Sequence, residues 1–143
     1  AWGKLVANAA INPLTALLRV PNGFLLEHAA LVAIMRQTAA EVAAVAERQG
    51  IALPEGDAGE RAIAVARGTA ANRSSMLQDV ERGTLTEIDA ICGAVVRAGR
   101  AAGVATPLNS RLASLVAQVE SGNPPVAPGD VAGLIRQLDP AMR

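Results

Sequence analysis

Apolar residues recur along the chain at helical spacing, and no stretch alternates over the length of a convincing strand. The longest pattern covers about residues 25–49 and ends at Gly50. Its apolar side is marked by Leu31, Met35, Val42 and Val45. Further helices are predicted at the start of the chain and over about 60–72, 74–81, 84–102, 108–120 and 130–138. The pattern predicts an all-α fold, a compact bundle of about six to seven helices.

Glycine and proline mark where these helices should end. Pro13 removes a backbone donor inside the first pattern and predicts a kink or break there. Pro21-Asn22-Gly23 predicts a turn, and Thr84-x-x-Glu87 has the spacing of a capping box that opens the helix reaching Ala102. Residues 122–129, which include three prolines, predict a linker to a short last helix.

Length and composition exclude several classes of function. The 143 residues fit a single domain, 1–143. Thirteen basic residues balance thirteen acidic ones and aromatic residues make up 1%, so we expect neither nucleic acid nor a membrane as partner. Cys92 is the only cysteine and His28 the only histidine, so we expect no intrachain disulfide and no metal. No stretch of 18 apolar residues lacks charges and helix breakers, and we expect a cytoplasmic protein.

The first helix carries polar side chains where its neighbours are apolar. Lys4, Asn8 and Asn12 recur every four residues, which places them along one ridge about 12 Å long. The ridge either faces water as an ordinary solvated stripe or lines a polar cleft. Asparagine is a poor helix former, and a merely solvated face would normally carry Glu, Lys or Arg instead. Lys4 is also the only lysine among thirteen basic residues. Either it was kept by chance, or it has a role that arginine cannot fill, because lysine can give up a proton in a protein and arginine cannot.

A second polar concentration covers residues 72–79. Ser74 or Ser75 can cap the helix that follows, which leaves a positive helix end suited to carboxylates or phosphates. Capping alone explains one serine, and the capping box alone explains Glu87. Taken separately these residues are structural, but together they supply an amine, amides, a hydroxyl and a carboxylate.

These residues carry a resemblance to a known family. Residues 4–17, Lys-Leu-Val-Ala-Asn-Ala-Ala-Ile-Asn-Pro-Leu-Thr-Ala-Leu, followed by Pro21-Asn22-Gly23, resemble the opening of the C-terminal helical domain of ketopantoate reductases, the 2-dehydropantoate 2-reductases. Ser-Ser-Met-Leu-Gln-Asp at 74–79 with Thr-Glu-Ile-Asp at 86–89 resembles a second signature of that family, and Thr106-Pro107-x-Asn109 a third. The fold then resembles the C-terminal domain of 6-phosphogluconate-dehydrogenase-like reductases.

The resemblance implies a role for each matching residue. Lys4 falls on the catalytic lysine and Glu87 on the active-site glutamate, with a weaker match of Glu87 to cofactor binding. The substrate-binding positions are matched by Asn8, Asn12, Ser75 and, less closely, Asn72. Cys92-Gly93 departs from the family's frequent Asn-Gly, which we interpret as a tolerated packing change.

The resemblance also implies that the chain is half of an enzyme. The family's N-terminal Rossmann domain binds NADPH through a glycine-rich loop, whereas this chain has no Gly-x-Gly pair and begins at Ala1, almost directly in a helix. We therefore expect a domain of a longer protein, with Lys4 as general acid, a small 2-keto acid as substrate, and no activity without the Rossmann domain. A homodimer is a further partner that this interpretation allows. The alternatives are a helical domain of another NAD(P)-dependent 2-keto acid reductase and a non-catalytic helical dimerisation module.

Overall fold

The structure is a computed structural model that describes residues 1–143 and contains helices but no strand. Its seven α-helices are α1 (Trp2–Leu18), α2 (Ala29–Arg48), α3 (Ala58–Gly68), α4 (Ser75–Arg82), α5 (Ala94–Ala102), α6 (Pro107–Glu120) and α7 (Val131–Leu138). Three shorter segments complete the fold: the 3-10 helices η1 (Asn22–Glu27) and η3 (Asp139–Met142), and the π-helix η2 (Asp89–Gly93). The all-α prediction is confirmed.

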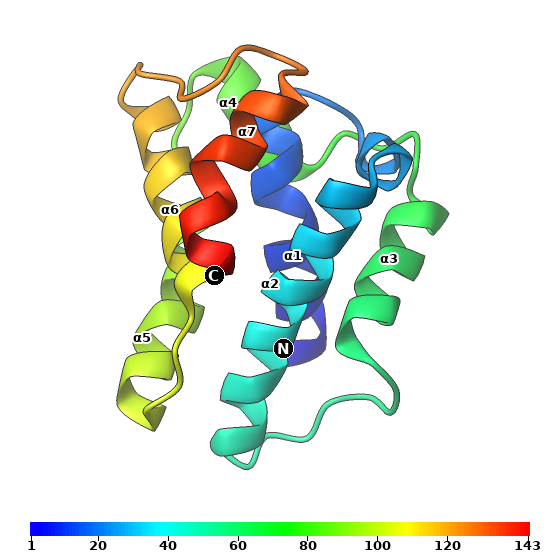
Figure 1. The fold of residues 1–143 in the computed structure, drawn as a ribbon, viewed down its shortest axis with the longest axis vertical. Coiled ribbons are helices and arrows are strands. Elements are labelled where there is room, and N and C mark those ends of the chain that lie inside the picture. Colours follow the sequence, from blue (N-terminus) through cyan, green and yellow to red (C-terminus); the bar gives the residue numbers. More distant parts are fainter.

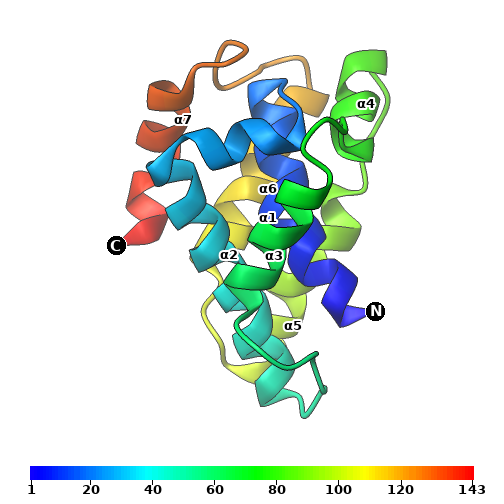
Figure 2. The ribbon, with the colours of Figure 1, turned by 90° about the vertical axis from the view of Figure 1, so that its right-hand side faces the viewer.

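Helix α1 lies at the centre of the bundle, between α2 and α3 on one side and α6 on the other (Figures 1 and 2). From Ala9 to Leu18 every side chain is buried. Of the kink or break predicted at Pro13, the break is wrong, because α1 continues through this residue to Leu18. Pro13 is itself buried, and packing on all sides holds the helix together despite the missing backbone donor.

Helix α2 is the long core helix that the pattern predicted, although it begins at Ala29 rather than near Leu25. By length and composition alone it would pass for a membrane-spanning helix, as core helices of globular proteins do. Its apolar side chains Leu31 and Met35 are completely buried, and it packs against α1 and α3. His28 directly precedes its first turn, at the N-cap position.

The predicted turn at Pro21-Asn22-Gly23 leads into η1 and is fastened to the segment that follows α3. The Asn22 amide donates to the Asn72 carbonyl at 3.0 Å, and the Gly23 amide donates to the Ala70 carbonyl at 2.9 Å. A Cβ on Gly23 would lie 2.6 Å from the Ala70 Cβ, so only glycine allows this approach. The pairing also explains why α3 ends at Gly68, four residues before its predicted end.

A buried carboxylate joins α2 to the first turn of α6. Glu41 accepts hydrogen bonds from the Leu108 amide at 2.9 Å, the Asn109 amide at 3.0 Å and the Asn109 side-chain Nδ2 at 2.9 Å. Thr106 occupies the N-cap position of α6 but makes no capping bond with its side chain, so Glu41 caps this helix from 67 and 68 residues away in the chain. The Thr106-Pro107-x-Asn109 motif is thus part of the contact between the two helices.

We expect Glu41→Ala to lower the free energy of unfolding by about 3 kcal/mol, because three buried donors would lose a charged acceptor. The control is Glu47→Ala on the same helix, where the side chain is exposed and the expected change is within about 0.5 kcal/mol. Urea unfolding of both variants measures the difference. Equal stabilities of the two variants would contradict a structural role for the Glu41 carboxylate.

Cys92 is completely buried in η2, as expected for a small apolar residue. Burial, with a smaller contribution from the Glu41 carboxylate, raises the pKa of the Cys92 thiol far above its ordinary value. Because the thiolate is the reactive form, we expect the folded protein to resist a thiol reagent at pH 8, and the protein in urea to react fully. Stoichiometric labelling of the folded protein within minutes would show this account of Cys92 to be wrong.

Candidate functional site

The polar ridge of α1 has the geometry that its spacing predicts. Lys4 and Asn8 are exposed, whereas Asn12 is only 8% exposed. Lys4 takes part in none of the ion pairs of the chain, and the side-chain amides of Asn8 and Asn12 have no hydrogen-bond partner within it. The polar atoms of Asn12 are not among the buried atoms without a partner, so its amide is open to water or a ligand, as are the exposed side chains of Lys4 and Asn8.

The two serines before α4 have different roles. Ser74 is the N-cap of α4 and accepts the Leu77 amide at 3.0 Å, which resolves the choice between the serines that the sequence left open. Its hydroxyl also bonds to Thr15 Oγ1 at 2.7 Å, and Thr15 Oγ1 donates to the Asn12 carbonyl at 3.0 Å. Ser75, the first residue of α4, is exposed and free of the capping role. Two hydrogen bonds therefore link the start of α4 to the Asn12 end of the ridge.

Asn72 lies two residues before this cap. Its carbonyl is held by the Asn22 amide, while its side chain is exposed. The segment from Asn72 to Ser75 is thus anchored at both ends, by Asn22 and by Thr15. Asn72 and Ser75 come from the same short connection, and α4 packs directly against α1.

Glu87 lies between α4 and η2, and the predicted capping box is wrong. Thr84 Oγ1 donates to the Asp79 carbonyl of α4 at 3.2 Å instead of capping the next helix, and the helical segment begins at Ile88. Thr86 takes the capping role, because its hydroxyl accepts the Ile88 amide at 3.1 Å. The Glu87 carboxylate is exposed and belongs to no ion pair of the chain.

The structure therefore brings some of the predicted residues together by direct contacts and leaves others apart. Lys4, Asn8 and Asn12 share one helix face, and Ser75 and Asn72 are fastened near its second half. Glu87 precedes η2, which packs against α1, but no ion pair or hydrogen bond joins Glu87 to Lys4.

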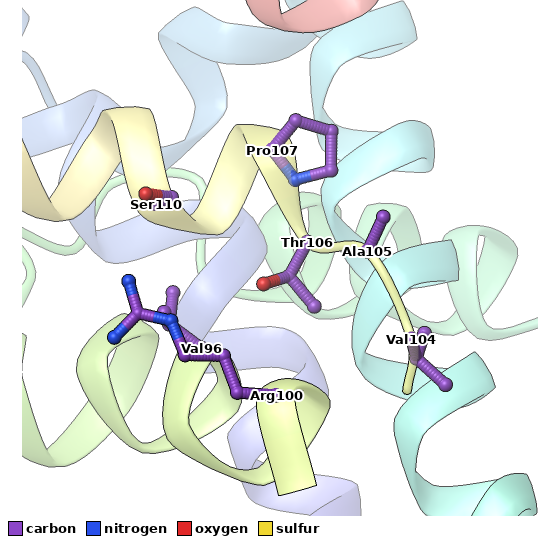
Figure 3. A pocket seen from close by; sticks show the side chains of 7 residues that line it. All are labelled: Val96, Arg100, Val104, Ala105, Thr106, Pro107 and Ser110. Carbon is purple, nitrogen blue, oxygen red and sulfur yellow. The ribbon is translucent and has the colours of Figure 1, made fainter. Parts of the chain in front are cut away.

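None of the six predicted residues lines one of the three hollows of the structure. The hollow of about 270 Å³ lies between α5 and the start of α6, where Arg100 extends toward Ser110 (Figure 3). The others, of about 430 Å³ and 50 Å³, lie beside Arg48 and beside Glu120. No group of three potential metal ligands occurs in the structure. Lys4, Asn8, Asn72, Ser75 and Glu87 are exposed on the surface, and Asn12 is nearly buried.

Several residues that hold this surface in place were missed by sequence reasoning. Thr15 positions the start of α4, Asn22 holds Asn72, and Glu120 accepts hydrogen bonds from Thr86 beside Glu87. Thr15 and Asn22 lie within quoted motifs but have no spacing that identifies their partners. Glu120 does have a signal, since a carboxylate is unfavourable at the C-terminal end of a helix.

Comparison with known proteins agrees with the family suggested by the motifs. Residues 1–120 match the family described as ketopantoate reductase PanE/ApbA C terminal. The chain is 46% identical over 121 residues to 2-dehydropantoate 2-reductase of Archaeoglobus fulgidus, an alignment that covers 85% of this chain and 40% of that protein. It is 44% identical over 120 residues to the Shigella flexneri enzyme of the same name, which covers 84% of this chain and 39% of that protein.

Solved structures of related reductases share the fold. The PanE/ApbA family ketopantoate reductase of Ralstonia eutropha superimposes with a TM-score of 0.80 at 36% identity, covering 85% of this chain and 41% of that chain. D-mandelate dehydrogenase, solved with NADH and anilino(oxo)acetate, gives a TM-score of 0.76 at 30% identity over 85% of this chain and 40% of that chain. The chain spans about two fifths of the length of these relatives. It belongs to the family of ketopantoate reductase C-terminal domains.

Proposed function

We propose that this chain is the substrate-binding and catalytic domain of an NADPH-dependent ketopantoate reductase, which reduces 2-dehydropantoate to pantoate for pantothenate biosynthesis in the cytoplasm. The observation that carries the proposal is the ridge on α1, where one ammonium and two amides are left without partners. The resemblance of their motif to the family places them at its catalytic and substrate-binding positions, and the match of residues 1–120 to that family supports the assignment.

Lys4 is the general acid of the proposed reaction. Reduction of a ketone places growing negative charge on the carbonyl oxygen, which needs a positive group nearby and finally a proton. The Lys4 ammonium, exposed and unpaired at the start of α1, supplies both. Arginine would stabilise the charge but would not transfer the proton.

The remaining residues bind and orient the keto acid. Ser75 and the free amides at the start of α4 bind its carboxylate, because a helix N-terminus offers N–H groups and a positive dipole end. Asn8 and Asn12 hydrogen-bond its keto and hydroxyl oxygens, and Asn72 borders the same region. Glu87 either orients the Lys4 ammonium or accepts a substrate hydroxyl.

The nicotinamide cofactor, which supplies hydride when bound, does not fit this chain by itself. A dinucleotide is normally held by a glycine-rich turn between a strand and a helix, and the chain has neither a strand nor a Gly-x-Gly pair. Its relatives are more than twice as long as the part that they share with it. We infer that an N-terminal Rossmann domain forms the opposite wall of the cleft and holds NADPH, with Glu87 as the residue of this chain that the resemblance matches to cofactor binding.

A second candidate is reduction of another 2-keto acid, which the similarity to D-mandelate dehydrogenase favours. A phenyl-bearing acid would require an apolar, preferably aromatic, surface next to the ridge. The chain offers only Trp2 and Phe24 as aromatic side chains. Turnover of ketopantoate against phenylglyoxylate, the keto acid related to mandelate, distinguishes the two candidates.

In the full-length enzyme, we expect Lys4→Ala to lower kcat by about 10²–10⁴-fold, the usual cost of losing a general acid. Lys4→Arg should restore ketopantoate binding but little turnover, because charge returns without a transferable proton. Arg67→Ala, which removes an exposed cation from α3, is the control and should leave kcat unchanged. Near-normal turnover of Lys4→Ala would contradict the proposal.

The isolated chain of residues 1–143 should not oxidise NADPH with ketopantoate, and calorimetry should detect little NADPH binding. Both expectations follow from the missing dinucleotide fold. The matched control is the full-length protein under the same conditions. Turnover by the isolated chain would show that the proposed division between two domains is wrong.

A further inference from the structure

Glu120, the last residue of α6, makes two hydrogen bonds to a residue beside Glu87. Its Oε2 accepts from the Thr86 amide at 2.7 Å and from Thr86 Oγ1 at 2.8 Å. Glu120 and Thr86 are both half-buried and lie 34 positions apart in the chain. The contact therefore joins the end of α6 to the connection between α4 and η2.

A carboxylate at this position is unfavourable for the helix itself. The C-terminal end of a helix carries partial negative charge and favours cations. Five of the seven α-helices follow this preference, with a basic residue in the last turn: Arg48, Arg67, Arg82, Arg100 and Arg136. Helix α6 has no basic residue there and ends in Glu120. Helix stability does not explain Glu120, whereas its two charge-assisted hydrogen bonds to Thr86 do.

These hydrogen bonds fix the backbone on both sides of Glu87. Thr86 Oγ1, while donating to Glu120, accepts the Ile88 amide at 3.1 Å, so one hydroxyl joins the residues before and after Glu87. The Glu87 carbonyl accepts the Ile91 amide at 3.0 Å. The Thr86 amide, the Ile88 amide and the Glu87 carbonyl are thus held, while the Glu87 carboxylate is left exposed and unpaired.

We propose that Glu120 is a positioning residue for Glu87, acting through Thr86. This inference rests on the proposed function of Glu87 in the reductase. Glu120 does not touch the substrate in this scheme. It fixes the backbone next to Glu87 and thereby the orientation of the Glu87 side chain. A small displacement of a group that contacts the reacting centre costs a large factor in rate, so losing this restraint lowers turnover without removing a reacting group.

The experiment measures kcat/KM of single and double variants of the full-length enzyme. Glu120→Ala should lower kcat/KM about tenfold, and Glu120→Gln less, since its amide oxygen still accepts hydrogen bonds. Thr86→Val keeps the amide bond to Glu120 but loses the hydroxyl bonds to Glu120 and to the Ile88 amide, so it should also lower kcat/KM, and Thr86→Ser should restore activity. Glu60→Ala is the matched control, because it removes a carboxylate that pairs with Arg36 far from this connection and should leave kcat/KM unchanged.

A double-variant cycle separates positioning from general stability. If Glu120 acts through Glu87, the Glu87→Ala/Glu120→Ala enzyme is no slower than Glu87→Ala alone. Independent losses that multiply, or full activity of Glu120→Ala beside an impaired Glu87→Ala, would overturn this inference and leave the proposed function standing. Full activity of Glu87→Ala would instead remove the role of Glu87 in the proposed function, and this inference with it.

Discussion

The structure depends on α1 serving two purposes at once. From Ala9 onward its side chains are buried in the centre of the bundle, yet the ridge from Lys4 to Asn12 stays uncovered by other helices at its start and without partners along its length. A central helix is fixed by packing on several sides, so the backbone positions from which the ridge side chains project are fixed. At the second end of the ridge Asn12 is only 8% exposed, so the ridge passes from open surface into the bundle.

The other site residues come from connections, which packing alone does not hold rigidly. Hydrogen bonds of hydroxyl groups hold these connections in place at two positions. Thr15 and Ser74 bond to each other and fix the start of α4 beside α1, and Thr86 with Glu120 fixes the backbone around Glu87. In both cases the fastening residue is next to the predicted functional residue in the chain, so the functional side chain itself stays free. This division explains why Ser74 caps the helix and Ser75 does not.

Helical periodicity and the positions of glycine and proline were sufficient to predict the all-α class and most helices, because these signals act within a few residues. The errors come from contacts that spacing does not reveal. Pro13 does not break α1 because the helix is buried from Ala9 to Leu18. Thr84 and Glu87 do not form a capping box because Thr84 bonds to the Asp79 carbonyl and Thr86, held by Glu120 34 residues later, accepts the Ile88 amide. Residue type and spacing identified Lys4, Asn8 and Asn12 as a ridge. Their roles came from the resemblance, and both these roles and a homodimer stay predictions.

The family match and the folded unit do not end at the same residue. The contacts that hold the predicted site lie in the matched part, whereas the hydrophobic core extends beyond it. The match ends at Glu120, the residue that fastens Thr86, so every contact that holds the predicted site lies within residues 1–120. The core continues beyond it, because Leu134 and Leu138 of α7 are completely buried and Arg111 of α6 donates to the Gln137 carbonyl at 3.0 Å. The Gly129 amide donates to the Leu18 carbonyl at 2.8 Å, which ties the segment before α7 to the end of α1 (Figure 1). Residues 121–143 thus stabilise the central helix at the end opposite Lys4. A substitution in these residues changes the stability of the fold more directly than the geometry of the site.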